Sequence, residues 1–119
     1  MKQVLLVSCI LFALGNAKAQ SLIKLAEVDR HIGDSVTVCG KVESMRYFEN
    51  GKGKPTLLNI GAAFPNQLLT VLIWDETRSL FPGKLEDLLK KEICITGRII
   101  LYKEKPEIII NKTEQLVVQ

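Results

Sequence analysis

Two segments of the chain alternate apolar and polar residues in the same way. Residues 36–42 and 93–99 carry β-branched side chains at every second position, and each alternation is interrupted only by a glycine. Such alternation is typical of strands with one buried face, and an interior glycine usually marks a bulge or a bend. Two long, bent strands in a chain of 119 residues predict one small coiled barrel.

The same reading along the rest of the chain predicts five strands in total. The third expected strand is almost continuously apolar, which indicates that both of its faces are covered. Polar stretches that contain glycine or proline separate the strands. The expected strands span residues 35–47, 56–60, 68–74, 92–102 and 107–111.

Two helices are predicted besides the strands. Residues 21–32 are expected to form an arm and a helix that ends at Gly33, since glycine commonly caps helix C-termini. Leucines at spacing i, i+3 and i+4 predict a helix from Leu85 to Lys90. This order of elements is that of the oligonucleotide/oligosaccharide-binding (OB) barrel. The predicted fold class is therefore all-β, a five-stranded Greek-key OB barrel with a short N-terminal helix and one helix between strands three and four.

Several short motifs give the chain a resemblance to known OB-fold proteins. They are His31-Ile32-Gly33, residues 36–42, Pro65-Asn66-Gln67, Ile73-Trp74, residues 93–97 and residues 105–108. Through them the chain resembles small exported bacterial OB-fold proteins and the OB modules attached to some extracellular nucleases, over nearly all of residues 20–119. The resemblance implies a nucleic-acid-binding protein. It carries over no catalytic residue, because the OB module is not the catalytic part of those nucleases.

The first 19 residues have the layout of a secretory signal peptide. Lys2 precedes an apolar run over residues 4–14, and the small-x-small ending Ala17-Lys18-Ala19 follows. The run is shorter than the ~20 residues that span a bilayer. We expect cleavage after this ending, which leaves residues 20–119 as one OB domain without a membrane span in an exported protein, periplasmic or secreted. An alternative makes Cys9 the lipid-attachment residue of a lipobox, but few apolar residues precede it.

The charge balance changes when this segment is removed. The full chain has 16 Lys and Arg against 13 Asp and Glu, a net charge of +3. Lys2 and Lys18 lie in the first 19 residues, so residues 20–119 hold 14 basic and 13 acidic residues, a net charge of +1. A near-neutral balance does not predict general binding to polyanions. An affinity for nucleic acid has to come from cations gathered locally.

Two cysteines remain in the expected mature chain. Cys39 and Cys94 occupy matching positions in the two alternating segments, and an even cysteine count in an oxidising compartment favours a disulfide. We expect them to be bridged if their strands are neighbours. The alternative is two buried free thiols that fill space. Two cysteines and the single His31 do not make a zinc site, so no metal and no cofactor are predicted.

The sequence predicts a binding protein rather than an enzyme. It shows no pair of His and carboxylate at a recognisable catalytic spacing, and its acidic residues are scattered. Residues 51–54 (GKGK) lack the spacing of a phosphate-binding loop, and no helix is expected after them. A nuclease, the remaining enzymatic alternative, would show metal-dependent cleavage.

The candidate ligand site follows from the expected barrel. OB barrels hold ligands across strands two and three, between the loops that follow strands one and four. Both loops combine aromatic and basic residues, as single-stranded nucleic acid binding requires. The predicted ligand-binding residues are Arg46, Tyr47, Lys52, Lys54, Asn59, Thr70, Trp74, Tyr102, Lys103 and Lys105.

Alternatives remain open for these residues. Lysines in exposed turns commonly serve solubility, and strands two and three carry no aromatic residue before Trp74, which itself suits a core or lid position. The predicted function is therefore an exported OB module that binds single-stranded DNA or RNA. The alternative is an exported OB accessory protein that binds a protein, peptide or small ligand. The sequence leaves the oligomeric state open.

Overall fold

The structure, a computed structural model, describes residues 21–119. The predicted signal peptide at residues 1–19 and the alternative lipid site at Cys9 lie outside the described residues. The strands are β1 (Ser21–Ile23), β2 (Ser35–Tyr47), β3 (Thr56–Ile60), β4 (Leu69–Ile73), β5 (Glu92–Arg98), β6 (Ile100–Tyr102), β7 (Lys105–Ile110) and β8 (Leu116–Val118). One short α-helix, α2 (Asp75–Arg78), and three 3₁₀ helices, η1 (Leu25–Arg30), η2 (Leu85–Leu88) and η3 (Thr113–Gln115), complete the described chain.

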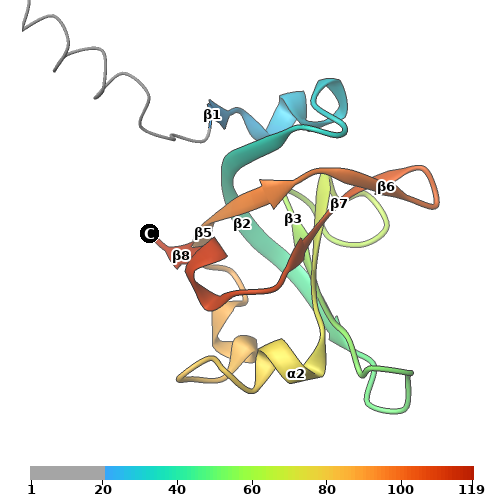
Figure 1. The fold of residues 1–119 in the computed structure, drawn as a ribbon, viewed down its shortest axis with the longest axis vertical. Coiled ribbons are helices and arrows are strands. Elements are labelled where there is room, and N and C mark those ends of the chain that lie inside the picture. Colours follow the sequence, from blue (N-terminus) through green and yellow to red (C-terminus); the bar gives the residue numbers. More distant parts are fainter. Residues whose placement is uncertain (1–20) are drawn as a thin grey trace, which may run out of the picture.

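The strands form one strongly curved sheet in the order β6-β7-β4-β3-β2-β5-β8, with β1 added in parallel to β2 (Figure 1). Strands β4 and β7 pair in parallel, whereas β2 pairs with β3 and β5 in antiparallel fashion. A single residue, Ile99, separates β5 from β6, so one bent strand joins β2 at one end and β7 at the other. This pairing closes the sheet on itself. The fold is all-β and OB-like, as the sequence predicts.

The predicted number of strands and the positions of the helices are wrong. The expected fourth strand is broken at Ile99, and β1 and β8 add two short edge strands. Residues 21–32, expected as an arm and a helix that ends at Gly33, form the strand β1 and the 3₁₀ helix η1, which ends at Arg30. The expected helix 85–90 is only the 3₁₀ turn η2, while α2 lies before it. A 3₁₀ helix has three residues per turn, so Leu85 and Leu88 point to the core while Leu89 is exposed.

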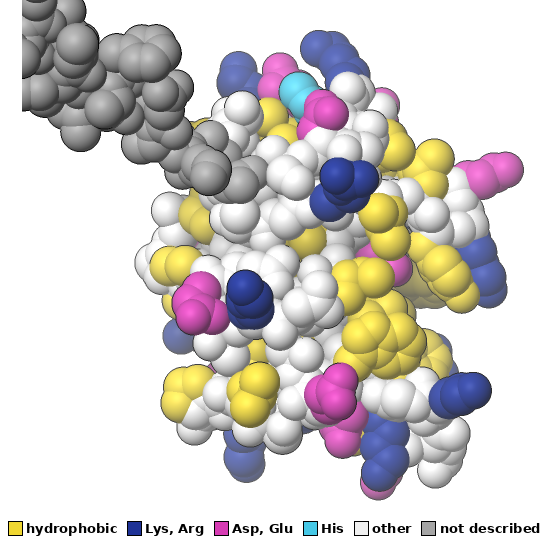
Figure 2. Space-filling model, in the orientation of Figure 1, with side chains coloured by type: hydrophobic (Ala, Val, Ile, Leu, Met, Phe, Trp, Pro, Cys, Tyr) yellow, Lys and Arg dark blue, Asp and Glu magenta, His cyan; other side chains and the backbone are white. Residues whose placement is uncertain are grey.

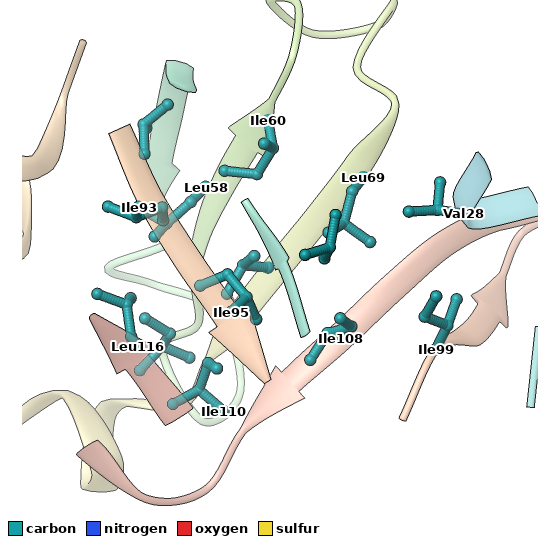
Figure 3. Packing of buried hydrophobic residues seen from close by; sticks show 14 of the residues in the cluster. Val28, Leu58, Ile60, Leu69, Ile93, Ile95, Ile99, Ile108, Ile110 and Leu116 are labelled. Atoms are coloured by element: carbon teal, nitrogen blue, oxygen red, sulfur yellow. The ribbon is translucent and has the colours of Figure 1, made fainter. Parts of the chain in front are cut away.

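The apolar positions of the two alternating segments supply much of the core. Residues of both segments, from Val36 to Val42 and from Ile93 to Ile99, pack against β3, β4 and β7 (Figure 3). A side chain at Gly40 would place its Cβ 2.6 Å from Ile60 Cγ2, and one at Gly97 would lie 2.7 Å from Ile108 Cγ2. The two mid-strand glycines therefore let neighbouring strands approach closely where the sheet bends.

The predicted disulfide is confirmed. Cys39 and Cys94 are direct partners in the antiparallel pair β2–β5, and their sulfur atoms are bonded at 2.05 Å. Their Cα atoms are 4.0 Å apart, closer than the range of about 4.4–6.8 Å expected for a disulfide. Thr37 and Thr96, two residues away on the same face, share a hydrogen bond of 2.8 Å between their hydroxyls.

Candidate ligand-binding groove

A groove of about 780 Å³ lies on the outer face of the barrel. Its floor comes from β3, β4 and β7, and its walls come from the loops 48–55 and 61–67 and from the β6–β7 hairpin. Figure 1 shows these connections projecting to one side of the barrel. Figure 2 shows hydrophobic side chains gathered on that side, with Lys and Arg near both ends of the patch.

The groove floor consists of two rows of side chains that cross the strands. Side chains two positions apart on a strand share a face, so strand register decides which residues lie side by side. The first row, here called the polar rung, contains Ser44, Asn59, Thr70 and Glu107, each paired with the next. The second row, the apolar rung, contains Leu57, Leu72 and Ile109. The floor therefore has one hydrogen-bonding edge and one aliphatic edge.

Hydrogen bonds within the polar rung fix two side-chain amides. Asn59 Nδ2 donates to Ser44 Oγ at 3.0 Å, and the same oxygen accepts the backbone N–H of Phe64 at 3.1 Å. Gln67 Nε2 donates to Thr70 Oγ1 at 3.0 Å. The other end of each amide, Asn59 Oδ1 and Gln67 Oε1, is buried without a hydrogen-bond partner among residues 21–119.

Glu107 ends the polar rung as a buried acid. Its side chain is 5% exposed, and no hydrogen bond to its carboxyl group is found within the described part of the chain. Burial disfavours the charged form and raises the pKa of Glu107 above its ordinary value of 4.5. The groove floor therefore carries an acid that folding makes harder to ionise.

Replacing Glu107 with Gln is expected to stabilise the protein at neutral pH. Because the folded-state pKa is raised, the folded state binds the proton more tightly, and stability falls as pH rises from the ordinary pKa through the folded one. Gln lacks this penalty, so Glu107→Gln should melt at a higher temperature than wild type at pH 7.5, and the gap should close near pH 4. Thermal melts over this range check it, with exposed Glu104→Gln as the control. A gap that is independent of pH would contradict it.

Aromatic side chains form the walls of the groove. Trp74 is 38% exposed and packs against the 48–55 loop, where a Cβ at Gly53 would lie 2.7 Å from Trp74 Cε3. The backbone N–H of Asp75 donates to the Gly53 carbonyl at 3.1 Å and holds that loop in place. Phe48 and Tyr102 also line the groove. Rings thus stand beside the floor rather than on it.

Basic side chains surround these rings. Lys52, Lys103 and Lys105 line the groove. Lys105 Nζ donates to the Pro65 carbonyl at 2.6 Å, which links the β6–β7 hairpin to the 61–67 loop. Lys103 Nζ lies 5.4 Å from the centre of the Tyr102 ring. The rim is therefore cationic while the floor is apolar and acidic.

Seven of the ten predicted ligand-binding residues line this groove: Lys52, Asn59, Thr70, Trp74, Tyr102, Lys103 and Lys105. Lys54 lies in a second, adjoining hollow of about 580 Å³, which shares Gly51 and Trp74 with the groove. Arg46 does not line the groove, but its guanidinium stacks on the ring of Phe48 at 4.6 Å. Whether these residues bind a ligand stays a prediction.

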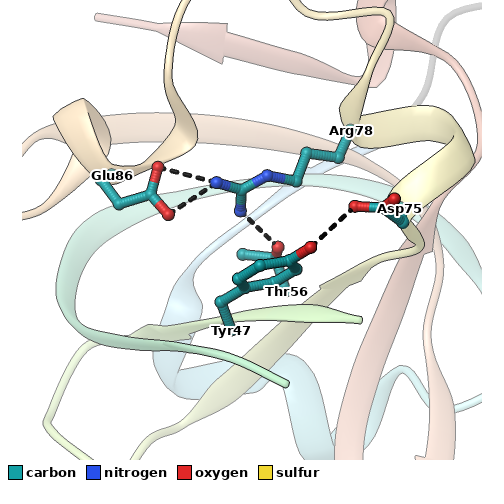
Figure 4. A network of polar contacts seen from close by, with 5 residues as sticks. All are labelled: Tyr47, Thr56, Asp75, Arg78 and Glu86. Carbon is teal, nitrogen blue, oxygen red and sulfur yellow. Dashed lines mark hydrogen bonds and ion pairs between the residues drawn. The ribbon is translucent and has the colours of Figure 1, made fainter. Parts of the chain in front are cut away.

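Tyr47 lies outside the groove, in a polar network at one end of the barrel (Figure 4). Its hydroxyl donates to Asp75 at 3.1 Å, and Arg78 stacks on its ring at 4.4 Å. Arg78 in turn donates to Thr56 Oγ1 at 2.6 Å and pairs with Glu86. Burial and the bond to Asp75 raise the pKa of Tyr47, and the bond from Arg78 lowers that of Glu86.

A bulge in β2 explains the position of Tyr47. The register with β3 shifts between Val42 and Ser44, which reverses the alternation of side chains beyond that point. Ser44 joins the groove face, whereas Met45 packs against the core and Tyr47 follows it. Without the bulge, alternation continued from buried Val42 would place Ser44 on the core face and Tyr47 on the outer face.

Several groove residues are absent from the predicted set. They are chiefly Phe48, Leu57, Phe64, Gln67, Leu72, Glu107 and Ile109. The alternation of the strands carries a signal for Leu57 and Leu72, which share a face with Asn59 and Thr70. Glu107 depends on the parallel pairing of β4 with β7, and Gln67 depends on the path of a loop. No local pattern announces either feature.

Comparison with known proteins supports the fold. No family model matches the chain, and no curated protein matches it. Among solved structures, a chain of the yeast Stn1 and Ten1 crystal structure aligns with a TM-score of 0.61 and 13% identity, over 87% of this chain and 64% of that one. An aspartyl-tRNA synthetase candidate from Leishmania major Friedlin aligns with a TM-score of 0.50 and 11% identity, over 87% of this chain and 21% of that one.

These likenesses concern the fold alone, since the identities are low. The chain spans about a fifth of the synthetase candidate and less than two thirds of the yeast chain. Within residues 21–119, no cluster of three or more His, Cys, Asp or Glu side chains is placed to hold a metal ion. No helix in that range is long and apolar enough to cross a membrane.

Proposed function

We propose that this protein is an exported OB-fold module that binds single-stranded nucleic acid in the groove. The observation that carries the proposal is the arrangement of the groove: a floor with one polar and one apolar rung, walls with aromatic rings, and a rim with Lys52, Lys103 and Lys105. Single-stranded nucleic acid offers bases for the rings and phosphates for the lysines, and both are needed for tight, sequence-tolerant binding.

The position of the rings favours unpaired bases. Trp74 and Tyr102 are 38% and 56% exposed, so each presents part of its surface to the groove. A base in a duplex is already stacked, and a duplex therefore offers the rim lysines its phosphates but gives the walls nothing to contact. With a net charge of only +1 on residues 20–119, phosphate contacts alone give a weak case for duplex binding.

Export and a non-enzymatic role belong to the same proposal. The Cys39–Cys94 bridge supports export, because disulfides persist mainly in oxidising compartments. The groove holds a single carboxyl group, Glu107, rather than the paired acids or bases that general acid–base chemistry uses. The site is therefore proposed to bind its ligand and leave it unchanged.

A second candidate function has one observation in its favour. The apolar rung is aliphatic, with Leu57, Leu72 and Ile109 and no ring among them. OB domains that stack the bases of a single strand on their sheet carry aromatic residues on that sheet surface. An aliphatic floor suits an apolar peptide side chain or a small apolar ligand, which would make the protein an exported accessory factor.

The fluorescence of Trp74 tests the proposal directly, because Trp74 is the single tryptophan of the chain and lines the groove. We expect a mixed-sequence single-stranded oligonucleotide of about ten nucleotides to quench it in a saturable way, and less so at high salt. The matched duplex should quench it far less. No quenching and no anisotropy change of labelled oligonucleotide at low salt would contradict nucleic-acid binding. Saturable quenching by apolar peptides alone would favour the second candidate.

A further inference from the structure

We propose that the groove floor contains a base-recognition subsite that prefers guanine, a deepening that rests on the proposed function. The subsite consists of Asn59 Oδ1 and Gln67 Oε1, two buried amide oxygens without a partner in the described chain, on either side of the Thr70 hydroxyl. Their chemistry calls for a ligand edge that presents adjacent N–H donors.

Asn59 is the anchor of this subsite. It is 4% exposed, and its amide nitrogen is already committed to Ser44 Oγ. Ser44 Oγ also accepts the Phe64 N–H, so the loop above the floor and the floor itself hold the amide in one orientation. A buried carbonyl oxygen without a donor is unfavourable, and a ligand that supplies the donor removes that penalty.

Gln67 brings the second oxygen to the same place. Its nitrogen donates to Thr70 Oγ1, and Thr70 is the direct cross-strand partner of Asn59. Cross-strand partners have Cβ atoms about 4.5–5.5 Å apart, so the two amides flank a single hydroxyl. Both lie in the lining of the groove together with Glu107. In the proposed complex, the edge of one base reaches both oxygens.

The acceptors select among bases by their hydrogen-bonding edges. Guanine presents N1–H and the N2 amino group next to each other, so both oxygens gain a donor. Thymine and uracil present one N–H between two carbonyls, which would face the amide oxygens unfavourably. Adenine and cytosine offer an amino group beside a ring acceptor. Because amide oxygens only accept, guanine is the base that fits both positions.

The charges of the groove favour an orientation of the nucleic acid in which a base faces this subsite. Glu107 ends the polar rung on the floor and is 5% exposed, whereas Lys52, Lys103 and Lys105 stand at the rim. A phosphate is repelled from an acid and attracted by lysines, so the backbone lies along the rim and a base points to the floor. The Glu107 carboxyl adds a third acceptor at that end of the rung.

The test places one variable base in an oligothymidine host. Oligonucleotides that differ only at the central position, with thymine, guanine, adenine, cytosine, hypoxanthine or 2-aminopurine there, are titrated against Trp74 fluorescence. We expect guanine to bind about tenfold tighter than thymine, the scale of one bidentate base contact. Hypoxanthine lacks the amino group and 2-aminopurine lacks N1–H, so each should lose most of the gain.

Variants connect the preference to the two amides. Gln67→Ala and Asn59→Ala should each bring the ratio of guanine to thymine affinity close to one, and this ratio is compared with wild type whatever the overall affinity of the variant. Gln67 lies in a loop, so its variant keeps the test valid if the buried Asn59→Ala unfolds. Neighbouring Asn66→Ala, an exposed loop residue, should keep the preference. Equal binding of all six oligonucleotides, or a preference for thymine or adenine, overturns the guanine subsite and leaves the proposed function standing. Binding of none overturns both.

Discussion

Replacing Cys39 and Cys94 together with Ala is expected to lower the free energy of unfolding by about 4 kcal/mol, because the bridge closes a loop between residues 55 positions apart. The bridge lowers the conformational entropy of the unfolded chain, and its removal restores that entropy and so favours unfolding. For a domain of about 100 residues, the change corresponds to a fall in melting temperature of about 20 °C. Differential scanning calorimetry with and without reductant measures it.

The neighbouring threonines supply a matched control for the disulfide. Thr37 and Thr96 join the same two strands on the same face, through one hydroxyl hydrogen bond of 2.8 Å. Replacing both with Val should cost no more than about 1.5 kcal/mol, the usual worth of one such bond. If the double cysteine variant loses no more stability than the threonine variant, the bridge does not act as a chain-entropy constraint. Wild type treated with reductant should match the cysteine variant.

The strands of the barrel could be predicted because their signals are local. Residues 36–42 alternate apolar and polar side chains, turn residues bound the stretch 56–60, and the structure places β2 and β3 on the predicted ranges 35–47 and 56–60. The glycines at 40 and 97 predicted a bulge or a bend, and the structure shows in addition that a Cβ at either position would meet a neighbouring strand within 3 Å. The cysteine pairing followed from the matching positions of the two segments.

Other features depend on tertiary structure and left no local signal. A leucine spacing of i, i+3 suits both an α-helix and a 3₁₀ turn, and the choice at Leu85 depends on which leucines the core accepts. Strand β1 exists only because Val36–Val38 offers it a parallel partner, and β8 exists only because β5 has a free edge. Such short edge strands follow from pairing rather than from propensity.

The candidate site was predictable only where a local pattern, such as strand alternation, places its residues. Asn59 and Thr70 could be placed on one groove face because strands alternate, and the loop lysines followed from the OB element order. Glu107 could not, since its place depends on the parallel register of β4 with β7. Tyr47 was assigned to the groove as part of the aromatic and basic loop after the first strand, but it ends β2 beyond the bulge and hydrogen-bonds to Asp75 instead.

Replacing Lys52, Lys54, Lys103 and Lys105 together with Ala is expected to remove most of the salt dependence of nucleic-acid binding. Lys52, Lys103 and Lys105 line the groove, and Lys54 lies in the adjoining hollow. If they contact about four phosphates, the slope of log affinity against log salt should be near −3 on single strands. Wild type should then lose about 60-fold in affinity between 50 and 200 mM salt, and the variant about twofold.

Two comparisons separate this local effect from simpler causes. Replacing Lys41, Lys84, Lys91 and Lys112 with Ala removes the same charge from outside both hollows, and this control should keep the slope. Tyr102→Ala should lower affinity by about 1–3 kcal/mol through lost stacking while leaving the slope unchanged. If the control set flattens the slope as much as the groove set, net charge governs binding and the groove is not the phosphate path. If neither set changes the slope, the rim lysines do not contact phosphate. Because residues 20–119 carry a net charge of only +1, the local set has to dominate for nucleic acid to be the ligand.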